Sequence, residues 1–376
     1  MTTTRDPSPP GELEGRQVSV ALEGLPGRSG CGRPGQQATV APAHHNEGGP
    51  SERARLRRLR NRPIVEAGAV AGYGPVFNAG LVGQDGVYHL FARAVRTGHR
   101  PGGPSGPRFV DYVSDILVFT SENGHRYDFG YVLARGGAGN TYSFEDPRVQ
   151  WVGRGRPDLV MTYTHLPAPD TGGPWRIGAQ HLQWDGDRFR LDASTEGLLG
   201  PSGVENKDAV VFTLDDGRVA LIHRIHPDMQ LAVFDDLDHL WHASAQYWEA
   251  HLADLGAHTL LSPSPGALGV GAGAPPVRTE AGFLLFFHER RADGSYTVNL
   301  ALLDAATGRV RSRLPEPILE PELSWERQGD VNEVVFVQGA HLDGDDLYLT
   351  YGAADRCVGA AVASASNLLN ALSRAA

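Results

Sequence analysis

Charged residues that could carry chemistry stand beside apolar, strand-like runs at four places in the chain. Carboxylic acids can supply a proton to a departing oxygen, and arginine and lysine bind oxyanions. Burying a charge costs free energy unless it is paired, so repeated charges at strand ends are typical of a polar funnel shared by several strands. Surface turns closed by local salt bridges would give the same pattern, and the spacing alone leaves both interpretations open. The four segments are Glu145-Asp146-Pro147-Arg148, Glu205-Asn206-Lys207-Asp208, His223-Arg224 and Asp355-Arg356.

Short apolar or alternating runs that follow glycine turns must position these residues. Residues 87–92 follow Asp85-Gly86, and residues 219–223 follow Asp216-Gly217. Asp-Gly pairs tolerate the positive φ that tight hairpins require, and repeated short strands of this kind indicate a sandwich, a barrel or a propeller. Helical periodicity is confined to residues 246–255 and 367–375, so the sequence predicts an all-β fold.

The predicted strands fall into about five groups, each with a turn-rich interior. The period alone does not distinguish a propeller from a sandwich. The groups lie near residues 63–105, 110–165, 175–235, 270–304 and 330–365.

Residues 1–57 are rich in glycine, proline, serine and charge, and we expect them to form a disordered tail. Residues 58–376 are then a single catalytic domain. A basic run at the boundary is interpreted as a solvated linker. Its members are Arg53, Arg55, Arg57, Arg58 and Arg60.

Composition excludes several classes of partner. The 376 residues carry a formal net charge of −10, which argues against nucleic acid, although a local basic pocket for an anion remains compatible with it. The two cysteines, Cys31 and Cys357, form neither a disulfide framework nor a zinc-ligand spacing. No apolar run resembles a signal peptide or a membrane span, so we expect a cytoplasmic protein with no membrane partner.

From Asn61 to about Ala363 the chain resembles glycoside hydrolase family 130, the β-mannoside phosphorylases and their hydrolytic relatives. Each matching stretch is short, but their order and spacing extend over the whole predicted domain. The resemblance implies a five-bladed β-propeller whose site lies at one end of the central channel. The matching stretches include Val76-Phe77-Asn78-Ala79-Gly80, Phe91-Ala92-Arg93-Ala94, Glu145-Asp146-Pro147-Arg148, Met161-Thr162-Tyr163-Thr164, Asn206-Lys207-Asp208, His223-Arg224 and Tyr351-Gly352-Ala353-Ala354-Asp355.

The resemblance also implies roles for individual residues. Asp146 matches the catalytic aspartate, whose proton is thought to pass through a mannose hydroxyl to the departing oxygen. Asn78, Arg93 and Asp355 match polar positions that hold the sugar at subsite −1. We expect further substrate contacts from Arg148, Tyr163 and Asp208, which lie in matching motifs. The group associated with inorganic phosphate is matched by Lys207, His223 and Arg224.

One acidic motif beside several cations fits phosphorolysis better than hydrolysis. An inverting glycosidase needs a general acid and a carboxylate base about 6.5–9.5 Å apart. A phosphorylase needs no base, because phosphate is already an anionic nucleophile, but it needs cations that hold that anion. The alternative is that Lys207 pairs only with Glu205 or Asp208, and that Arg224 pairs with Asp228.

The sequence therefore predicts an inverting phosphorylase that converts a β-mannoside oligosaccharide and phosphate to α-mannose 1-phosphate. A β-mannoside hydrolase and a non-catalytic carbohydrate-binding propeller are the alternatives. We expect no metal and no cofactor, with inorganic phosphate as the co-substrate, while a homo-oligomeric state stays open. One departure from the family pattern is Glu289 after His288, which would place a carboxylate in a loop near the acceptor. Tyr73, Trp175 and Tyr247 could stack on sugars, although core packing is the commoner role of such aromatics.

Overall fold

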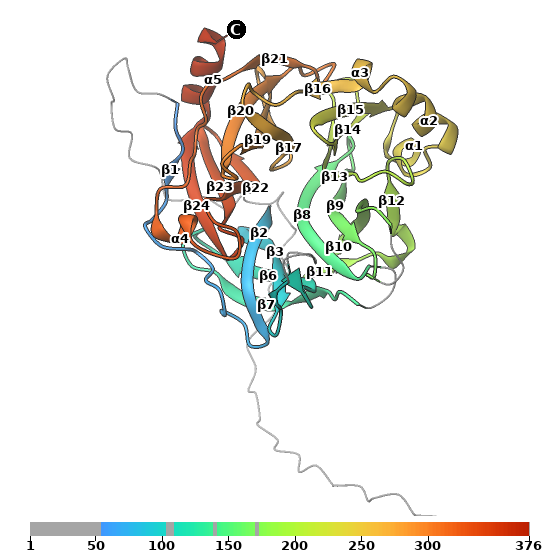
Figure 1. Cartoon of the computed structure of the whole chain (residues 1–376). Coiled ribbons are helices and arrows are strands. Elements are labelled where there is room, and N and C mark those ends of the chain that lie inside the picture. The colour runs from blue at the N-terminus through green and yellow to red at the C-terminus, as the bar shows by residue number, and fades with distance from the viewer. Residues whose placement is uncertain (1–53, 103–108, 138–140, 170–172, 376) are drawn as a thin grey trace, which may run out of the picture. The chain divides into compact units, whose positions relative to one another are not determined.

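Hairpins closed by glycine turns build the described part of the chain, which in this computed structural model comprises residues 54–102, 109–137, 141–169 and 173–375. Gly86 and Gly217 have φ values of 82° and 98°, which side-chain-bearing residues rarely adopt. The hairpins assemble into five antiparallel sheets that follow one another around a central axis in chain order (Figure 1). The predicted five-bladed β-propeller is confirmed.

Each of the first four blades is a continuous stretch of chain. The first contains β2 (Tyr73–Gln84), β3 (Val87–Arg96), β6 (Ser114–Ser121) and β7 (Asp128–Ala134). The second contains β8 (Ser143–Val152), β9 (Asp158–Leu166), β10 (Arg176–Trp184), β11 (Phe189–Leu191) and β12 (Gly197–Leu199). The third contains β13 (Lys207–Thr213), β14 (Val219–Ile225), β15 (Asp228–Phe234) and β16 (Thr259–Leu261). The fourth contains β17 (Ala267–Ala272), β18 (Val277–Thr279), β19 (Gly282–Arg291), β20 (Tyr296–Leu303) and β21 (Val310–Arg313).

The fifth blade is completed by a strand from the other end of the described chain. Three of its strands are consecutive: β22 (Val335–Asp343), β23 (Asp346–Ala353) and β24 (Cys357–Ser364). The fourth, β1 (Arg57–Arg58), is the first strand of the described residues and pairs with β24. This pairing closes the ring of blades.

The closing strand corrects the interpretation of the basic run as a solvated linker. Arg58 donates from Nε and NH2 to the fully buried carboxylate of Glu326, at 2.7 and 2.8 Å. Leu56 is buried in the core of the fourth and fifth blades. Residues 54–57 therefore belong to the folded domain, and the rest of the predicted tail lies outside the described residues.

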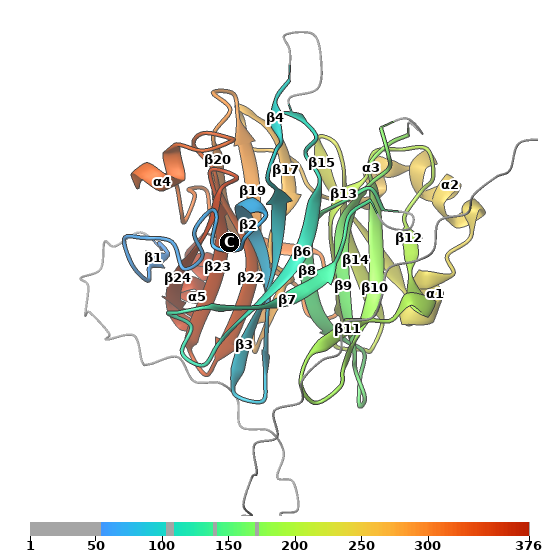
Figure 2. The same ribbon diagram turned by 90° about the horizontal axis from the view of Figure 1, so that it is seen from below.

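A strand pair between β3 and β6 explains why the blade boundary predicted near residues 105–110 is wrong. β4 (Arg100–Pro101) and β5 (Phe109–Val110) form this separate pair, which projects beyond one end of the sheets (Figure 2). The first blade resumes after this pair and ends at Ala134. The second predicted group therefore joined parts of two blades.

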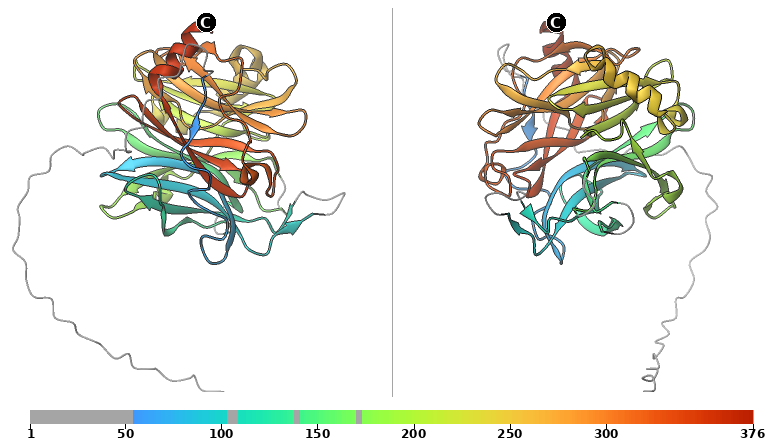
Figure 3. Two further views of the ribbon diagram at one scale, coloured as in Figure 1. Left: turned by 90° about the vertical axis from the view of Figure 1, so that its left-hand side faces the viewer. Right: turned by 45° about the vertical axis from the view of Figure 1, so that its right-hand side comes forward.

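Five α-helices and one 3-10 turn complete the described elements. The predicted helices at 246–255 and 367–375 are confirmed as α2 and α5. Helices α1 to α3 follow β15 and lie on the outer side of the third blade (Figure 3). The described ranges contain no helix with the length and apolar character needed to cross a membrane. The elements are η1 (Ala193–Thr195), α1 (Leu237–Trp241), α2 (Ala245–Ala253), α3 (Leu255–His258), α4 (Ser324–Arg327) and α5 (Ala365–Arg374).

The apolar core lies between neighbouring blades. Phe212 of the third blade and Phe283 of the fourth meet edge to face, with ring centroids 5.0 Å apart. Burial of each such ring contributes about 1.5–3 kcal/mol. His89 of the first blade is a titratable residue within this apolar core. It packs against Trp184 and Phe189, and neither of its ring nitrogens has a partner among the described residues. Burial lowers the pKa of His89 to about 4.

Candidate active site

Bulges in the first strands of three blades turn polar side chains toward the central axis. Asn78 of β2, Asp146 of β8 and Asp208 of β13 each stand at a shift of strand register. Their φ values are 45°, 53° and 53°, a left-handed conformation that Asn and Asp tolerate better than most residues. A bulge re-aims one side chain without ending the strand. The repeated bulge thus explains how strands of different blades deliver polar groups to one place.

These three residues line a cavity of about 810 Å³. Residues from all five blades surround it, together with part of the β4–β5 pair. The structure therefore brings together seven of the ten residues expected from sequence. They are Asn78, Arg93, Asp146, Lys207, Asp208, Arg224 and Asp355.

The Asp146 carboxylate is held on one oxygen and open on the other. Its Oδ1 accepts from Asn78 Nδ2 at 2.8 Å and lies 3.2 Å from Arg93 NH1. Its Oδ2 makes no hydrogen bond with the described residues. Two donors on one oxygen orient the carboxyl group and leave the second oxygen for a ligand.

Arg93 also contacts Glu145, the neighbour of Asp146, through NH2. Burial opposes the charge of Arg93, but Glu145 and Asp146 outweigh it and raise the pKa of the guanidinium. The Arg93 guanidinium lies over the Phe77 and Tyr112 rings, at 4.8 and 5.5 Å from their centroids. Burial raises the pKa of Glu145. Arg93 thus pairs with both carboxylates of the acidic pair.

Lys207 and Arg224 form a second, cationic part of the cavity. They are register partners on β13 and β14, so their side chains emerge on the same face of the sheet. Lys207 Nζ lies 4.0 Å from the Trp175 ring centroid and 4.0 Å from Glu205 Oε1. Burial, followed by the charge of Arg224, lowers the pKa of Lys207. Lys207 thus has a distant carboxylate partner in Glu205, whereas Arg224 has a close one in Asp208.

Asp208 anchors this cationic part. Its Oδ2 lies 3.1 Å from Arg224 Nε and 3.6 Å from His288 Nε2, and its Oδ1 lies 3.2 Å from Arg148 NH2. Burial would raise the pKa of Asp208, but these cations, Arg224 first, hold it well below its usual value. The alternative in which Arg224 pairs with Asp228 is therefore wrong, and Asp208 is its partner.

Arg148 does not line the cavity, in contrast to the substrate contact expected from sequence. It is buried below the cavity, where its Nε donates to Gly273 O and its NH2 to Ala272 O, both at 2.8 Å. NH1 donates to the carbonyl of Asp146 at 3.1 Å. Arg148 therefore ties the second blade to the third and fourth from beneath the site.

His223 lies away from the cavity, which corrects its expected place beside phosphate. Successive residues of a strand point to opposite faces, so Arg224 faces the cavity and His223 faces away from it. Its ring nitrogens contact Asn206 Oδ1 and His251 Nε2, each at 3.2 Å. Burial lowers the pKa of His223 to about 3. This neutral, enclosed imidazole supports the strand pair from behind.

Two further expectations are corrected. Tyr163 packs in the core of the first two blades, with its ring 4.8 Å from that of Phe144. Its ring covers Gly178 so closely that a Cβ added at that glycine would overlap the ring. Glu289 lies within β19, where it accepts from Ser264 N and Arg313, each at 2.7 Å. Neither residue lines the cavity.

Sequence reasoning did not assign a site role to several residues of the cavity. His288 of β19 lies there beside Asp208, and burial lowers its pKa to about 3. Tyr112 and Tyr296 also line the cavity, as does Trp175, for which stacking had been one alternative. For His288, its position within an apolar strand was the signal that could have drawn attention to it.

Comparisons with known proteins find relatives that match most of the chain. A family sequence model described as beta-1,4-mannooligosaccharide phosphorylase matches residues 52–374. The chain is 32% identical over 322 residues to a beta-1,2-mannobiose phosphorylase of Thermoanaerobacter sp. (strain X514), and 29% identical over 329 residues to a 1,2-beta-oligomannan phosphorylase of the same organism. Each match covers 82% of this chain and 97% of the relative.

Among solved structures, the chain is similar to beta-1,2-mannobiose phosphorylase from Listeria innocua in complex with beta-1,2-mannobiose. The TM-score is 0.67 at 21% identity, with 85% of this chain and 99% of the other covered. At this identity the likeness supports the fold.

Proposed function

Because the chain belongs to glycoside hydrolase family 130, we propose that it is an inverting phosphorylase that cleaves a β-mannosidic bond with inorganic phosphate. The products are α-mannose 1-phosphate and a mannoside shortened by one sugar. The relatives with the longest matches are phosphorylases by name, and the cavity that Asp146 lines is also lined by the neighbouring cations Lys207 and Arg224.

Asp146 supplies the proton for the departing oxygen. Its Oδ1 is held by Asn78 and Arg93, and its Oδ2 faces the substrate and passes the proton through a mannose hydroxyl. Asp355, whose φ is 51°, binds the same sugar from the fifth blade. General-acid catalysis of this kind contributes about 10²–10⁴-fold in rate.

The observation that carries the proposal is the position of Lys207 and Arg224 side by side on neighbouring strands in the wall of the cavity. A phosphate dianion between them would offset the cost of burying two like charges and would be held in line with the anomeric carbon. His288, rather than His223, is the imidazole within reach of this anion. Water as nucleophile would gain nothing from such a pair, so the geometry favours phosphorolysis.

We propose a β-1,2 linkage for the substrate. The two relatives matched over most of the chain act, by name, on beta-1,2-mannobiose and 1,2-beta-oligomannan. The family description names a β-1,4 substrate, so β-1,4-mannobiose is the comparison substrate. The oligomeric state and the cytoplasmic location expected from sequence stay predictions.

The decisive experiment measures products with and without phosphate. We expect saturable, phosphate-dependent release of mannose 1-phosphate from β-1,2-mannobiose, and little free mannose. Arg224→Ala removes one or more charge-assisted bonds, each about 1.5–3 kcal/mol, so the KM for phosphate should rise by at least about tenfold. The KM for mannobiose should change little. Arg218→Ala is the matched control, because Arg218 lies in the same blade and pairs with Asp216 at the surface.

Free mannose formed at the same rate without phosphate would replace this proposal by the hydrolase alternative. No cleavage of either mannobiose, together with saturable sugar binding, would favour the binding propeller. Both outcomes would leave the fold and the family assignment unchanged.

A further inference from the structure

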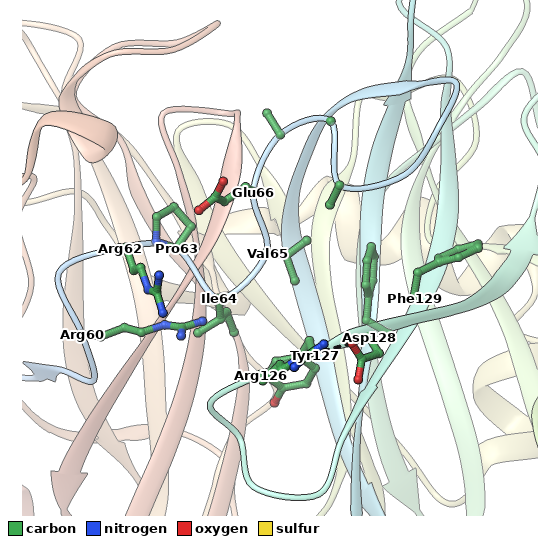
Figure 4. A pocket seen from close by; sticks show the side chains of 14 residues that line it. Arg60, Arg62, Pro63, Ile64, Val65, Glu66, Arg126, Tyr127, Asp128 and Phe129 are labelled. Carbon is green, nitrogen blue, oxygen red and sulfur yellow. Dashed lines mark ion pairs between the residues drawn. The ribbon is translucent and has the colours of Figure 1, made fainter.

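A second polar groove lies outside the catalytic cavity. It has a volume of about 500 Å³ and runs between the segment that joins β1 to β2 and the hairpin that joins β6 to β7. None of its lining residues lines the catalytic cavity. Figure 4 shows Arg60 and Arg62 on one side of the groove, and Arg126 with Asp128 across from them.

Two of the three arginines form no ion pair with the residues that the structure describes. Arg126 lies 3.4 Å from Asp128 in an exposed pair. Within the described ranges, neither Arg60 nor Arg62 forms an ion pair or a side-chain hydrogen bond, although Glu66 stands in the same wall. The Nε of Arg60 is buried and has no partner there.

This arrangement is unfavourable without a ligand. Burial, followed by the charge of Arg62, lowers the pKa of Arg60. An unpartnered buried N–H costs about 1–3 kcal/mol. The chain as a whole is acidic, with a formal charge of −10, so the clustering of guanidinium groups here does not reflect a basic surface in general.

We propose that this groove binds a phosphate group through Arg60, Arg62 and Arg126. Guanidinium forks match the oxygens of phosphate, and three forks from two walls suit a tetrahedral dianion. Pockets for small organic ligands measure about 300–1,000 Å³, so the groove has room for a group attached to the phosphate. Exposed Phe129, at 43% of its surface, provides an apolar edge for that group. The source is free phosphate or a sugar phosphate.

The test is the number of bound equivalents, measured by calorimetry at low ionic strength. Inorganic phosphate and mannose 1-phosphate are titrated separately, and neither reacts alone. Wild-type protein should bind one equivalent more than Arg60→Ala/Arg62→Ala. Arg126→Ala, on a different element, should weaken that additional equivalent by at least about tenfold. Arg57→Ala, which replaces an exposed arginine of the adjoining strand β1 outside the groove, is the control and should retain it.

Equal stoichiometry in the wild type and the double variant would overturn the proposal. The difference of one equivalent is independent of the catalytic cavity, because a cavity that bound no phosphate would lower both counts alike. Tighter binding of mannose 1-phosphate at the additional site would identify a sugar phosphate as the ligand, and tighter binding of inorganic phosphate would identify the free anion. The KM for phosphate in phosphorolysis should be the same in both proteins.

Discussion

Replacement of Arg148 by Met should separate a framework role from a substrate contact. The side chain donates four hydrogen bonds, to the carbonyls of Asp146, Ala272 and Gly273 and to the carboxylate of Asp208. Methionine has similar reach and can replace none of them. The carboxylate of Asp208 then keeps Arg224 as its cationic partner and the His288 ring as a neighbour.

The expected loss of stability follows from these contacts. Breaking a buried ion pair costs about 3–5 kcal/mol, and each orphaned carbonyl adds about 1–3 kcal/mol. Because Asp208 retains Arg224, we take the lower end of both ranges, which for one ion pair and three carbonyls gives about 6 kcal/mol in total. This is a large share of the roughly 5–15 kcal/mol by which native proteins are stable.

Equilibrium unfolding in urea measures this loss, followed by intrinsic fluorescence. A double-mutant cycle with Asp208→Asn isolates the pair, and the double variant should be more stable than the sum of the single effects by about 1–3 kcal/mol. A variant within about 1 kcal/mol of wild type, with a raised KM for mannobiose, would refute this reasoning. Arg148 would then contact substrate as the sequence suggested.

Three further predictions follow from the site and its supports. Asp146→Asn should lower turnover of mannobiose by about 10²–10⁴-fold and of an activated aryl mannoside by less; equal losses on both substrates would contradict a role as acid. His89 has a pKa of about 4 when folded and about 6.5 when unfolded, so the unfolded chain binds more protons between these values and stability falls as pH drops from 7 toward 4. At pH 5.5 this group costs about 1.4 kcal/mol, and His89→Leu should remove that part of the pH dependence measured by urea unfolding. A chain that starts at residue 52 should fold and retain activity. A chain that starts at residue 59 lacks Leu56 and Arg58, so Glu326 is buried without its cation. Its free energy of unfolding in urea should be lower by about 3–5 kcal/mol.

The fold could be predicted because short local sequence patterns determine its turns. Asp-Gly pairs and short apolar runs indicate hairpins wherever they occur, and the family resemblance then selects a propeller. Blade boundaries are harder, because a blade is defined by which hairpins share a sheet. The β4–β5 pair interrupts the first blade without any change in local pattern.

The site was predicted best at positions where Asn or Asp occupies a left-handed backbone conformation. Asn78, Asp146 and Asp208 combine a polar side chain with tolerance of positive φ, and all three line the cavity. His223 was wrongly assigned to the phosphate site together with Arg224. Successive side chains of a strand point to opposite faces, so only one of these two neighbours can face the cavity. Arg148 was misplaced because a sequence does not show whether a charge near a site faces it or supports it.

The closing strand has a consequence for synthesis of the protein. β1 leaves the ribosome before any blade, whereas its partner β24 is the last strand of the fifth blade. Arg57 can therefore pair with Val362 only at the end of synthesis. Contacts between such distant positions slow folding, because a long loop must be ordered before they form. A nascent chain with four finished blades still has an open sheet edge, which is prone to association with other chains. The ring therefore becomes a single cooperative body only after translation has passed its last strand.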